Sequence, residues 1–198
     1  MYLIDIRHLR RVCSVLLLLC AAATAAATPA PIGGDFRLTG HDGEPWSSQE
    51  ARGQVVVMAF GYTFCPDVCP TALATVAAAM TELGEDAERV QPVFVSLDPK
   101  RDTPERLRSY VEWFHPRMIG LTGSESELEG VADRYRVRYR VVREPDADYY
   151  TLDHSASLYV LDPQGRLARM LPHGLPPAAL VGAVEQLLED AAAADPGS

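Results

Sequence analysis

VVVMAFGYTFCPDVCPTAL, residues 55–73, joins an apolar run, two cysteines and the start of a helical pattern. The run Val55–Phe60 predicts a buried strand, and the stretch from Thr71 to Leu83 predicts a helix. Cys65 and Cys69 therefore lie at a strand-to-helix junction. At such a junction free amide N–H groups and the positive end of the helix dipole favour a thiolate, which is the form that attacks disulfides and binds metals.

The two cysteines offer more than one chemistry. Cys13 and Cys20 lie in the first twenty residues, so Cys65 and Cys69 are the only cysteines of the folded part. A structural disulfide is the ordinary interpretation of a single pair in an exported protein. A bridge across three residues, however, closes a short loop and constrains the unfolded chain little. Reversible redox chemistry or metal binding explains the spacing better.

The N-terminus has the layout of a secretory signal. Basic residues at 7–11 precede an apolar run over residues 12–23, and the alanines at 25–27 offer a cleavage site. We therefore predict a signal peptide over residues 1–27, a linker over 28–34 and an extracytoplasmic location, the bacterial periplasm. An uncleaved membrane anchor is the alternative, although the apolar run is shorter than the roughly 20 residues of a spanning helix.

Charge argues against nucleic acid as a partner. The chain carries a formal net charge of −9 over its 198 residues. Removal of the predicted signal takes away three Arg and one Asp, which leaves the remainder more acidic. An acidic surface repels phosphates. Solubility alone also explains an acidic composition. Any contact with a membrane is expected only through the N-terminal segment.

Strand and helix signals alternate along the rest of the chain, which predicts an α/β fold. The order is that of a thioredoxin-like domain with an N-terminal hairpin and insertions, over residues 35–190. A tail over residues 191–198 is small and acidic and is predicted to be disordered. The further predicted elements are a hairpin with its turn at Gly40–Pro45, strands at 92–97, 117–121 and 137–142, a helix from Pro104 with Thr103 as N-cap, a helix from the capping box Ser124–Glu127 to Tyr135, a hairpin of 158–161 with 167–171, and a last helix over 176–188.

Three features favour copper over general disulfide exchange. A thioredoxin separates its cysteines by two residues, whereas three lie between Cys65 and Cys69, a spacing that puts both sulfurs on one face of a helical turn. His154 precedes the hairpin strand at 158–161, on a loop predicted to face the cysteines. Residues 155–157, Ser-Ala-Ser, stand where a thioredoxin has its cis-proline, so the substrate-docking element is missing.

A lone histidine is more often a surface or core residue than a ligand. Two thiolates with one imidazole nevertheless form a ligand set that suits copper as both Cu(I) and Cu(II). The histidine is therefore kept as a candidate ligand.

Four motifs stand out along the chain: GYTFCPDVCP at 61–70, SLDPKRDTP at 96–104, FHPRMIGLTG at 114–123 and DHS at 153–155. Together they resemble the Sco/SenC family of copper chaperones, over about residues 33–188. The resemblance implies that Cys65, Cys69 and His154 bind copper. It also implies that the protein helps to metallate the dinuclear copper site of cytochrome c oxidase subunit II.

Other polar residues near these motifs have two interpretations. Asp98 resembles an acidic residue that the family has near its site, where it would act on the metal through the ligands, but a turn before Pro99 explains it equally well. Asp67 is explained as a solvated carboxylate at a helix start. Local structure accounts for His41, His115 and His173, and we expect Phe60, Tyr62, Phe64 and Tyr159 to shield the site from water.

The resulting hypothesis is a metallochaperone that passes copper by thiolate exchange. Its partners would be oxidase subunit II, or a similar exported copper protein, and a thiol reductant, because a Cys65–Cys69 disulfide has no thiolate to offer. The alternative is a thiol-disulfide reductase that keeps the cysteines of an exported copper protein reduced, which would need the dithiol but not His154. A peroxidase is weaker, since the residues before Cys65 lack the expected Pro and Thr arrangement.

Overall fold

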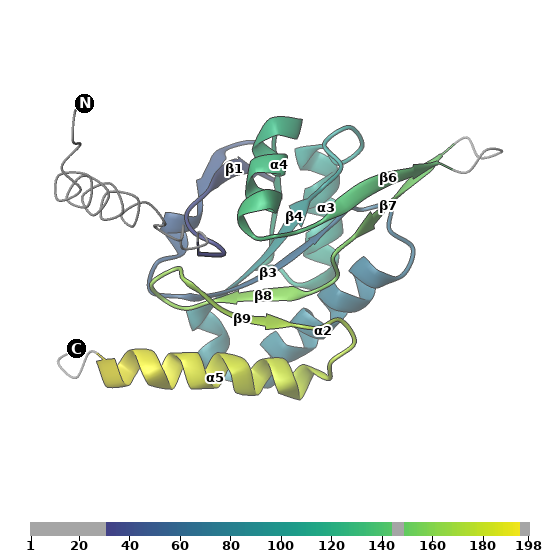
Figure 1. Cartoon of the computed structure of the whole chain (residues 1–198). Helices are drawn as coiled ribbons and strands as arrows, with labels where there is room; N and C mark the ends of the chain where they lie inside the picture. The colour runs from purple at the N-terminus through teal and green to yellow at the C-terminus, as the bar shows by residue number, and fades with distance from the viewer. Residues whose placement is uncertain (1–30, 144–148, 195–198) are drawn as a thin grey trace, which may run out of the picture. The chain divides into compact units, whose positions relative to one another are not determined.

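A seven-stranded sheet forms the centre of the fold in the computed structural model, which describes residues 31–143 and 149–194 (Figure 1). Its strand order is β2-β1-β5-β4-β3-β8-β9. The neighbours β3, β4 and β5 run parallel, and the remaining pairs are antiparallel. The bounds are β1 Arg37–Gly40, β2 Pro45–Ser47, β3 Val55–Gly61, β4 Val90–Ser96, β5 Ile119–Thr122, β8 Leu158–Leu161 and β9 Leu167–Leu171.

The two central strands are apolar because helices cover both sides of the sheet. All seven residues of β3 are buried, and in β4 only Gln91 is partly exposed. Buried parallel strands are expected to be continuous apolar runs of this kind. The strands pair in register from Val55 with Val90 to Gly61 with Ser96. The α/β thioredoxin-like architecture predicted from the sequence is confirmed.

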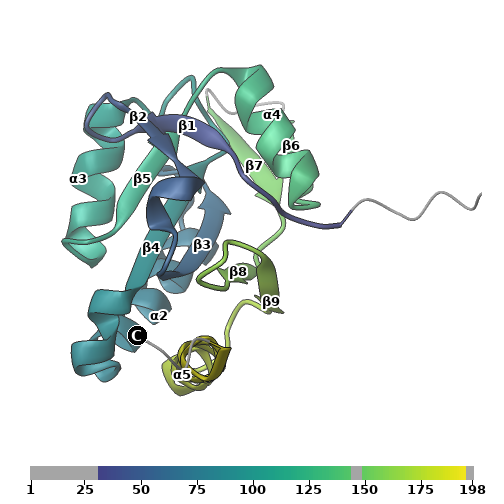
Figure 2. The same cartoon turned by 90° about the vertical axis from the view of Figure 1, so that its left-hand side faces the viewer.

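In the described part of the chain, four α-helices surround the sheet. Figure 2 shows α2 and α3 on one side and α4 on the other, while α5 packs along α2 (Figure 1). Thr103 caps α3 with Pro104 in its first turn, and Ser124 and Glu127 form a capping box at α4, as predicted. The helices are α2 Val68–Glu82, α3 Pro104–Phe114, α4 Glu125–Arg134 and α5 Pro177–Ala194, with short 3-10 helices at Ser48–Ala51 and Gly84–Arg89.

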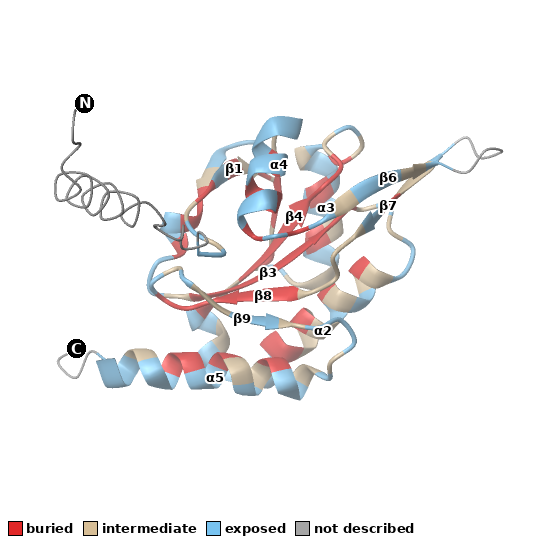
Figure 3. Cartoon of the chain, viewed as in Figure 1, coloured by how far each residue is buried: buried red, intermediate tan, exposed pale blue. Residues whose placement is uncertain are grey.

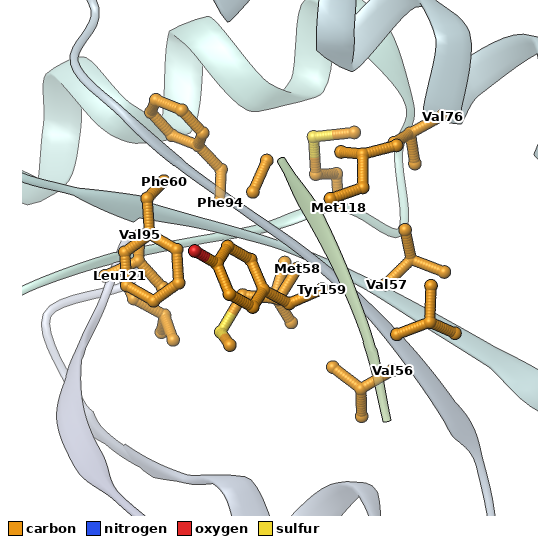
Figure 4. Packing of buried hydrophobic residues seen from close by; sticks show 14 of the residues in the cluster. Val56, Val57, Met58, Phe60, Val76, Phe94, Val95, Met118, Leu121 and Tyr159 are labelled. Carbon is orange, nitrogen blue, oxygen red and sulfur yellow. The ribbon is translucent and has the colours of Figure 1, made fainter. Parts of the chain in front are cut away.

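Buried residues concentrate on β3, β4 and β8 (Figure 3). Figure 4 shows side chains of these strands, of β5 and of α2 packed together. The rings of Phe60 and Tyr159 meet edge to face with centroids 5.3 Å apart, a preferred arrangement of aromatic pairs. This core holds the carboxyl end of β3, where the loop with the cysteines begins.

A separate two-stranded ribbon was only half predicted. Strands β6, Tyr139–Arg143, and β7, Tyr150–His154, pair antiparallel and extend beyond the central sheet (Figure 1). The sequence indicated β6 but not β7, because Leu152 is the only aliphatic residue of β7 and acidic or polar residues flank it. His154 therefore ends a strand and does not lie on a loop.

The end of α5 corrects the prediction of a disordered tail over residues 191–198. The helix continues to Ala194 because alanine has the highest helix propensity and no breaker occurs before Pro196. Residues 195–198 lie outside the described part of the chain, as do the predicted signal peptide, residues 1–27, and most of the linker. Within the described ranges no helix combines the length and the apolar character that a membrane span needs.

Candidate metal centre

The two cysteines occupy the junction between β3 and α2. Cys65 lies in the connecting loop and is half-buried, whereas Cys69 lies in the first turn of α2 and is 3% exposed. Both are free thiols. The backbone N–H of Cys69 donates to Cys65 Sγ at 3.5 Å, so the helix start provides a donor for the outer sulfur.

His154 approaches the inner sulfur from β7. Its Nε2 atom lies 3.4 Å from Cys69 Sγ, and its Nδ1 atom lies 2.9 Å from the carbonyl oxygen of Ser155. A carbonyl oxygen only accepts hydrogen bonds, so Nδ1 carries the proton of the neutral ring and Nε2 keeps its lone pair. The two sulfurs and one ring nitrogen lie within 4.8 Å of one another. The structure thus brings together the three residues singled out from the sequence.

The two thiols differ in protonation. The pKa of the Cys65 thiol is lowered to about 4, chiefly because the Cys69 thiol donates to its sulfur. Burial opposes this shift, while the backbone N–H groups of Asp67 and Cys69 support it. The pKa of the Cys69 thiol is raised, first by the same hydrogen bond and then by burial. At neutral pH the pair is therefore one thiolate and one thiol.

Gly61 makes room for the inner sulfur. A Cβ atom at this position would lie 2.4 Å from Cys69 Sγ and 3.0 Å from Cε2 of Phe94. Real Cβ atoms essentially never show the first distance, and the second is tighter than nine in ten real Cβ contacts. The phenyl ring is fully buried. Only glycine lets α2 start this close to the end of β3.

Asp98 does not contact the cysteines directly but connects to the strand that carries His154. Its Oδ1 accepts a hydrogen bond from Tyr150 Oη at 2.7 Å, and its Oδ2 pairs with Arg101 Nε. Its carbonyl oxygen accepts from the N–H of Arg101 and of Asp102, which forms the turn after β4. Asp98 therefore forms a turn before Pro99 and also connects to the strand that carries a candidate ligand, so each of the two interpretations describes part of its surroundings.

The sequence analysis missed Asp102, which supports the loop before the cysteines. The side chain is fully buried and accepts hydrogen bonds from the N–H of Thr63 at 3.0 Å, from Thr63 Oγ1 at 2.6 Å and from Ser96 Oγ at 2.6 Å. A buried carboxylate with three donors fixes the positions of those donors. The signal was present in the motif SLDPKRDTP, where Asp102 directly precedes the N-cap Thr103.

The aromatic residues around the site have separate roles. Tyr62 is 2% exposed and meets the His154 ring edge to face at 6.1 Å, so it shields the site as expected. Phe60 and Tyr159 belong to the core. The expectation is wrong for Phe64, which is 45% exposed.

Hydrogen bonds from backbone N–H groups account for two other histidines. His41 Nδ1 accepts from the N–H of Gly120 at 2.9 Å. His115 Nδ1 accepts from the N–H of Arg117 at 3.2 Å. Neither belongs to the group formed by the cysteines and His154.

Comparison with known proteins identifies relatives of this arrangement. The family model described as SCO1/SenC matches residues 24–189. A SCO2-like protein of Rickettsia felis is 43% identical over 136 residues, which cover 68% of this chain and 66% of that protein. The mitochondrial SCO1 homolog 1 of Arabidopsis thaliana is 43% identical over 140 residues, or 70% of this chain and 42% of that protein. The chain thus spans two thirds or less of these relatives' length.

Solved structures agree with the fold. Arabidopsis thaliana ScoI with copper bound is 38% identical, has a TM-score of 0.75, and the match covers 80% of this chain and 99% of that one. Bradyrhizobium japonicum ScoI with copper bound is 36% identical, with a TM-score of 0.73 and coverage of 79% and 99%.

The low pKa of Cys65 predicts the pH dependence of its alkylation. Iodoacetamide should modify Cys65 of the reduced protein at a rate nearly constant between about pH 6 and 9, because the thiolate is already formed. In Cys69→Ala the main cause of the shift is gone, so the rate should rise with pH as for an ordinary thiol with a pKa of about 8.5. A wild-type rate that rises about tenfold per pH unit between about pH 6 and 8 would contradict the assignment.

The packing of Gly61 predicts that Gly61→Ala displaces the Cys69 sulfur. We expect a destabilisation of about 1–3 kcal/mol in denaturant unfolding, because the added methyl overpacks a closed site. Alkylation of Cys65 should also become pH-dependent. Gly130→Ala is the control, since this exposed position in α4 has no atom within 4 Å of a new Cβ, and it should be neutral or stabilising. Unchanged stability and reactivity of Gly61→Ala would refute the close contact.

Proposed function

Since the chain belongs to the SCO1/SenC family, we propose that it is a copper chaperone whose cargo is held by Cys65, Cys69 and His154. The single observation that carries the proposal is the convergence of two sulfurs and one lone-pair nitrogen within 4.8 Å, from a loop, a helix start and a strand end. Soft thiolates with an imidazole suit Cu(I), and the same set also accepts Zn(II). The copper bound to the two solved relatives favours copper.

The protonation of the site suits capture of a cation at neutral pH. Cys65 is already a thiolate, and the lone pair of His154 Nε2 already faces the sulfurs because Ser155 holds Nδ1–H. Only Cys69 has to lose a proton. The neighbouring Cys65 thiolate keeps this proton on the Cys69 sulfur. The positive charge of an arriving Cu(I) acts in the opposite direction and favours its release. Capture therefore releases one proton and needs no rotation of the imidazole ring.

The proposed recipient is the dinuclear copper site of cytochrome c oxidase subunit II, as the family resemblance implies. Cysteine and histidine ligands of the recipient would replace those of the chaperone one at a time, beginning at the half-exposed Cys65. Loss of two electrons to an oxidant, with release of the one proton on Cys69, would join Cys65 and Cys69 in a disulfide and end binding. A thiol reductant would restore the site.

A thiol-disulfide reductase is the second candidate, and a specific observation favours it. An accessible thiolate whose pKa is about 4 beside a buried thiol is the arrangement of an attacking and a resolving cysteine. Such an enzyme would reduce the cysteines of an exported copper protein. It would not need the imidazole of His154, and this difference separates the two functions.

Substitution of His154 tests the choice. His154→Ala should still form and reduce the disulfide, but its Cu(I) affinity should fall by more than the 10- to 100-fold typical for groups behind the ligands. Cu(I) competition with a chelator and thiol titration measure the two properties. His115→Ala is the control and should match wild type, because the His115 ring accepts from the backbone N–H of Arg117 and does not belong to the group of candidate ligands.

The same variants decide the function in a cell that assembles a copper oxidase. A chaperone predicts that His154→Ala behaves like Cys65→Ser, with oxidase activity lost in both. Full oxidase assembly by a His154→Ala protein that no longer holds copper would refute the chaperone and favour the reductase.

We also propose that the protein acts outside the cytoplasm, in the bacterial periplasm, because residues 1–27 have the layout of a signal peptide. The intact mass of the exported protein should correspond to a chain that begins near Thr28. A membrane-bound form that retains Met1 through Ala27 would indicate an uncleaved anchor instead.

A further inference from the structure

The ribbon that carries His154 depends on packing for its position. Among the described residues β7 pairs only with β6, outside the central sheet. Side chains alternate along a strand, so Tyr150, Leu152 and His154 share one face of β7. Leu152 is 6% exposed, which shows that this face packs against the body of the protein. Whatever holds Tyr150 at the other end of the strand therefore also orients His154.

Arg101 holds Tyr150 by two direct contacts and by a third through Asp98. The guanidinium carbon lies 3.7 Å from the centroid of the Tyr150 ring, and Nη1 donates to the Tyr150 carbonyl oxygen at 2.9 Å. Nε pairs with Asp98, which in turn accepts the Tyr150 hydroxyl at 2.7 Å. Ring, backbone and hydroxyl of Tyr150 are thus all bound to the turn after β4.

The same guanidinium reaches the loop with the cysteines. Its carbon lies 4.6 Å from the centroid of Phe64, the residue before Cys65, and 5.6 Å from that of Tyr62. Tyr62 meets the His154 ring edge to face. Within the described part of the chain, the contacts of Arg101 therefore join the dithiol loop, the turn after β4 and the His154 strand.

The chemistry of the contacts requires arginine. A planar guanidinium stacks on aromatic rings while its N–H groups donate in its own plane, which an ammonium group does not do. Asp98 is 3% exposed, and a carboxylate buried to that extent needs charged or hydrogen-bonding partners. The ion pair, the stacked rings and the hydroxyl thus depend on one another.

We propose that Arg101 is a positioning residue for His154: by clamping Tyr150 between Asp98 and the dithiol loop, it keeps Nε2 of His154 beside Cys69. The inference rests on the proposed function for its consequence, the retention of copper. Its structural part concerns the reduced, copper-free protein and is tested there.

The test compares Arg101→Gln with Lys100→Gln in the full chain. Lys100 is the neighbouring residue, and within the described ranges its one ion pair is the exposed one with Glu125. Its replacement therefore changes the charge equally and leaves the contacts of Arg101 with Tyr150 in place. In Arg101→Gln the ¹⁵N and ¹H signals of the His154 ring should shift and its NOE contacts with Cys69 should vanish. Cu(I) affinity should fall about 10- to 100-fold, as when groups behind metal ligands are removed. Lys100→Gln should match wild type in both measurements.

Two further variants keep the proposal testable if Asp98, left unpaired, prevents Arg101→Gln from folding. Arg101→Lys keeps the charge beside Asp98 but loses the stacking, and Tyr150→Leu removes the clamped ring but leaves the ion pair. Both should displace the His154 ring signals and lower Cu(I) affinity, while the Cys65–Cys69 disulfide still forms.

Unchanged His154 signals and wild-type affinity in a folded Arg101→Gln, or in both further variants, would overturn the positioning role. The failure of the proposed function looks different. In that case wild type itself binds no stoichiometric Cu(I), while the ring signals of copper-free protein still respond to Arg101.

Discussion

The close packing of the Cys69 sulfur against the backbone of Gly61 is the constraint on which the site depends. It brings the first turn of α2 against the end of β3, so that a helix N–H reaches Cys65. The buried thiol then donates to the outer sulfur and makes it a thiolate. With a side chain at position 61 the helix would start farther away from β3, and the two cysteines would become ordinary thiols.

Buried carboxylates hold the surrounding loops in place. Asp102 gathers donors from Thr63 and Ser96, which ties the loop before the cysteines to the end of β4. Asp98, through Arg101 and Tyr150, ties the same region to β7. The motif SLDPKRDTP thus acts as a frame behind the ligands. Such buried charges are costly when unpaired, so each also enforces the contacts it makes.

The asymmetry of the dithiol accounts for both functions considered. An accessible thiolate beside a buried thiol is prepared for attack on a disulfide and equally for capture of a soft cation. The imidazole distinguishes the two, because its lone pair adds a third donor that thiol exchange does not require. A site of this kind can retain copper only while the cysteines are reduced, so redox state and metal occupancy are linked.

The sequence alone determined the local elements and the candidate ligands. Apolar runs such as Val55–Phe60, the cap at Thr103 and the capping box at Ser124 are set by interactions within a few residues, and all occur as predicted. The motifs also singled out the three candidate ligands. Cys65 and Cys69 are only four residues apart in the chain, so their proximity follows from spacing alone.

Only the tertiary structure decided how His154 joins them. It lies 85 residues after Cys69 along the chain, on a strand whose single aliphatic residue gives too weak a pattern to be recognised. That strand forms because its partner and the contacts of Tyr150 with Asp98 and Arg101 hold it there. Protonation of the cysteines and the need for glycine at position 61 likewise arise from groups that meet through space, and no local pattern encodes such distances.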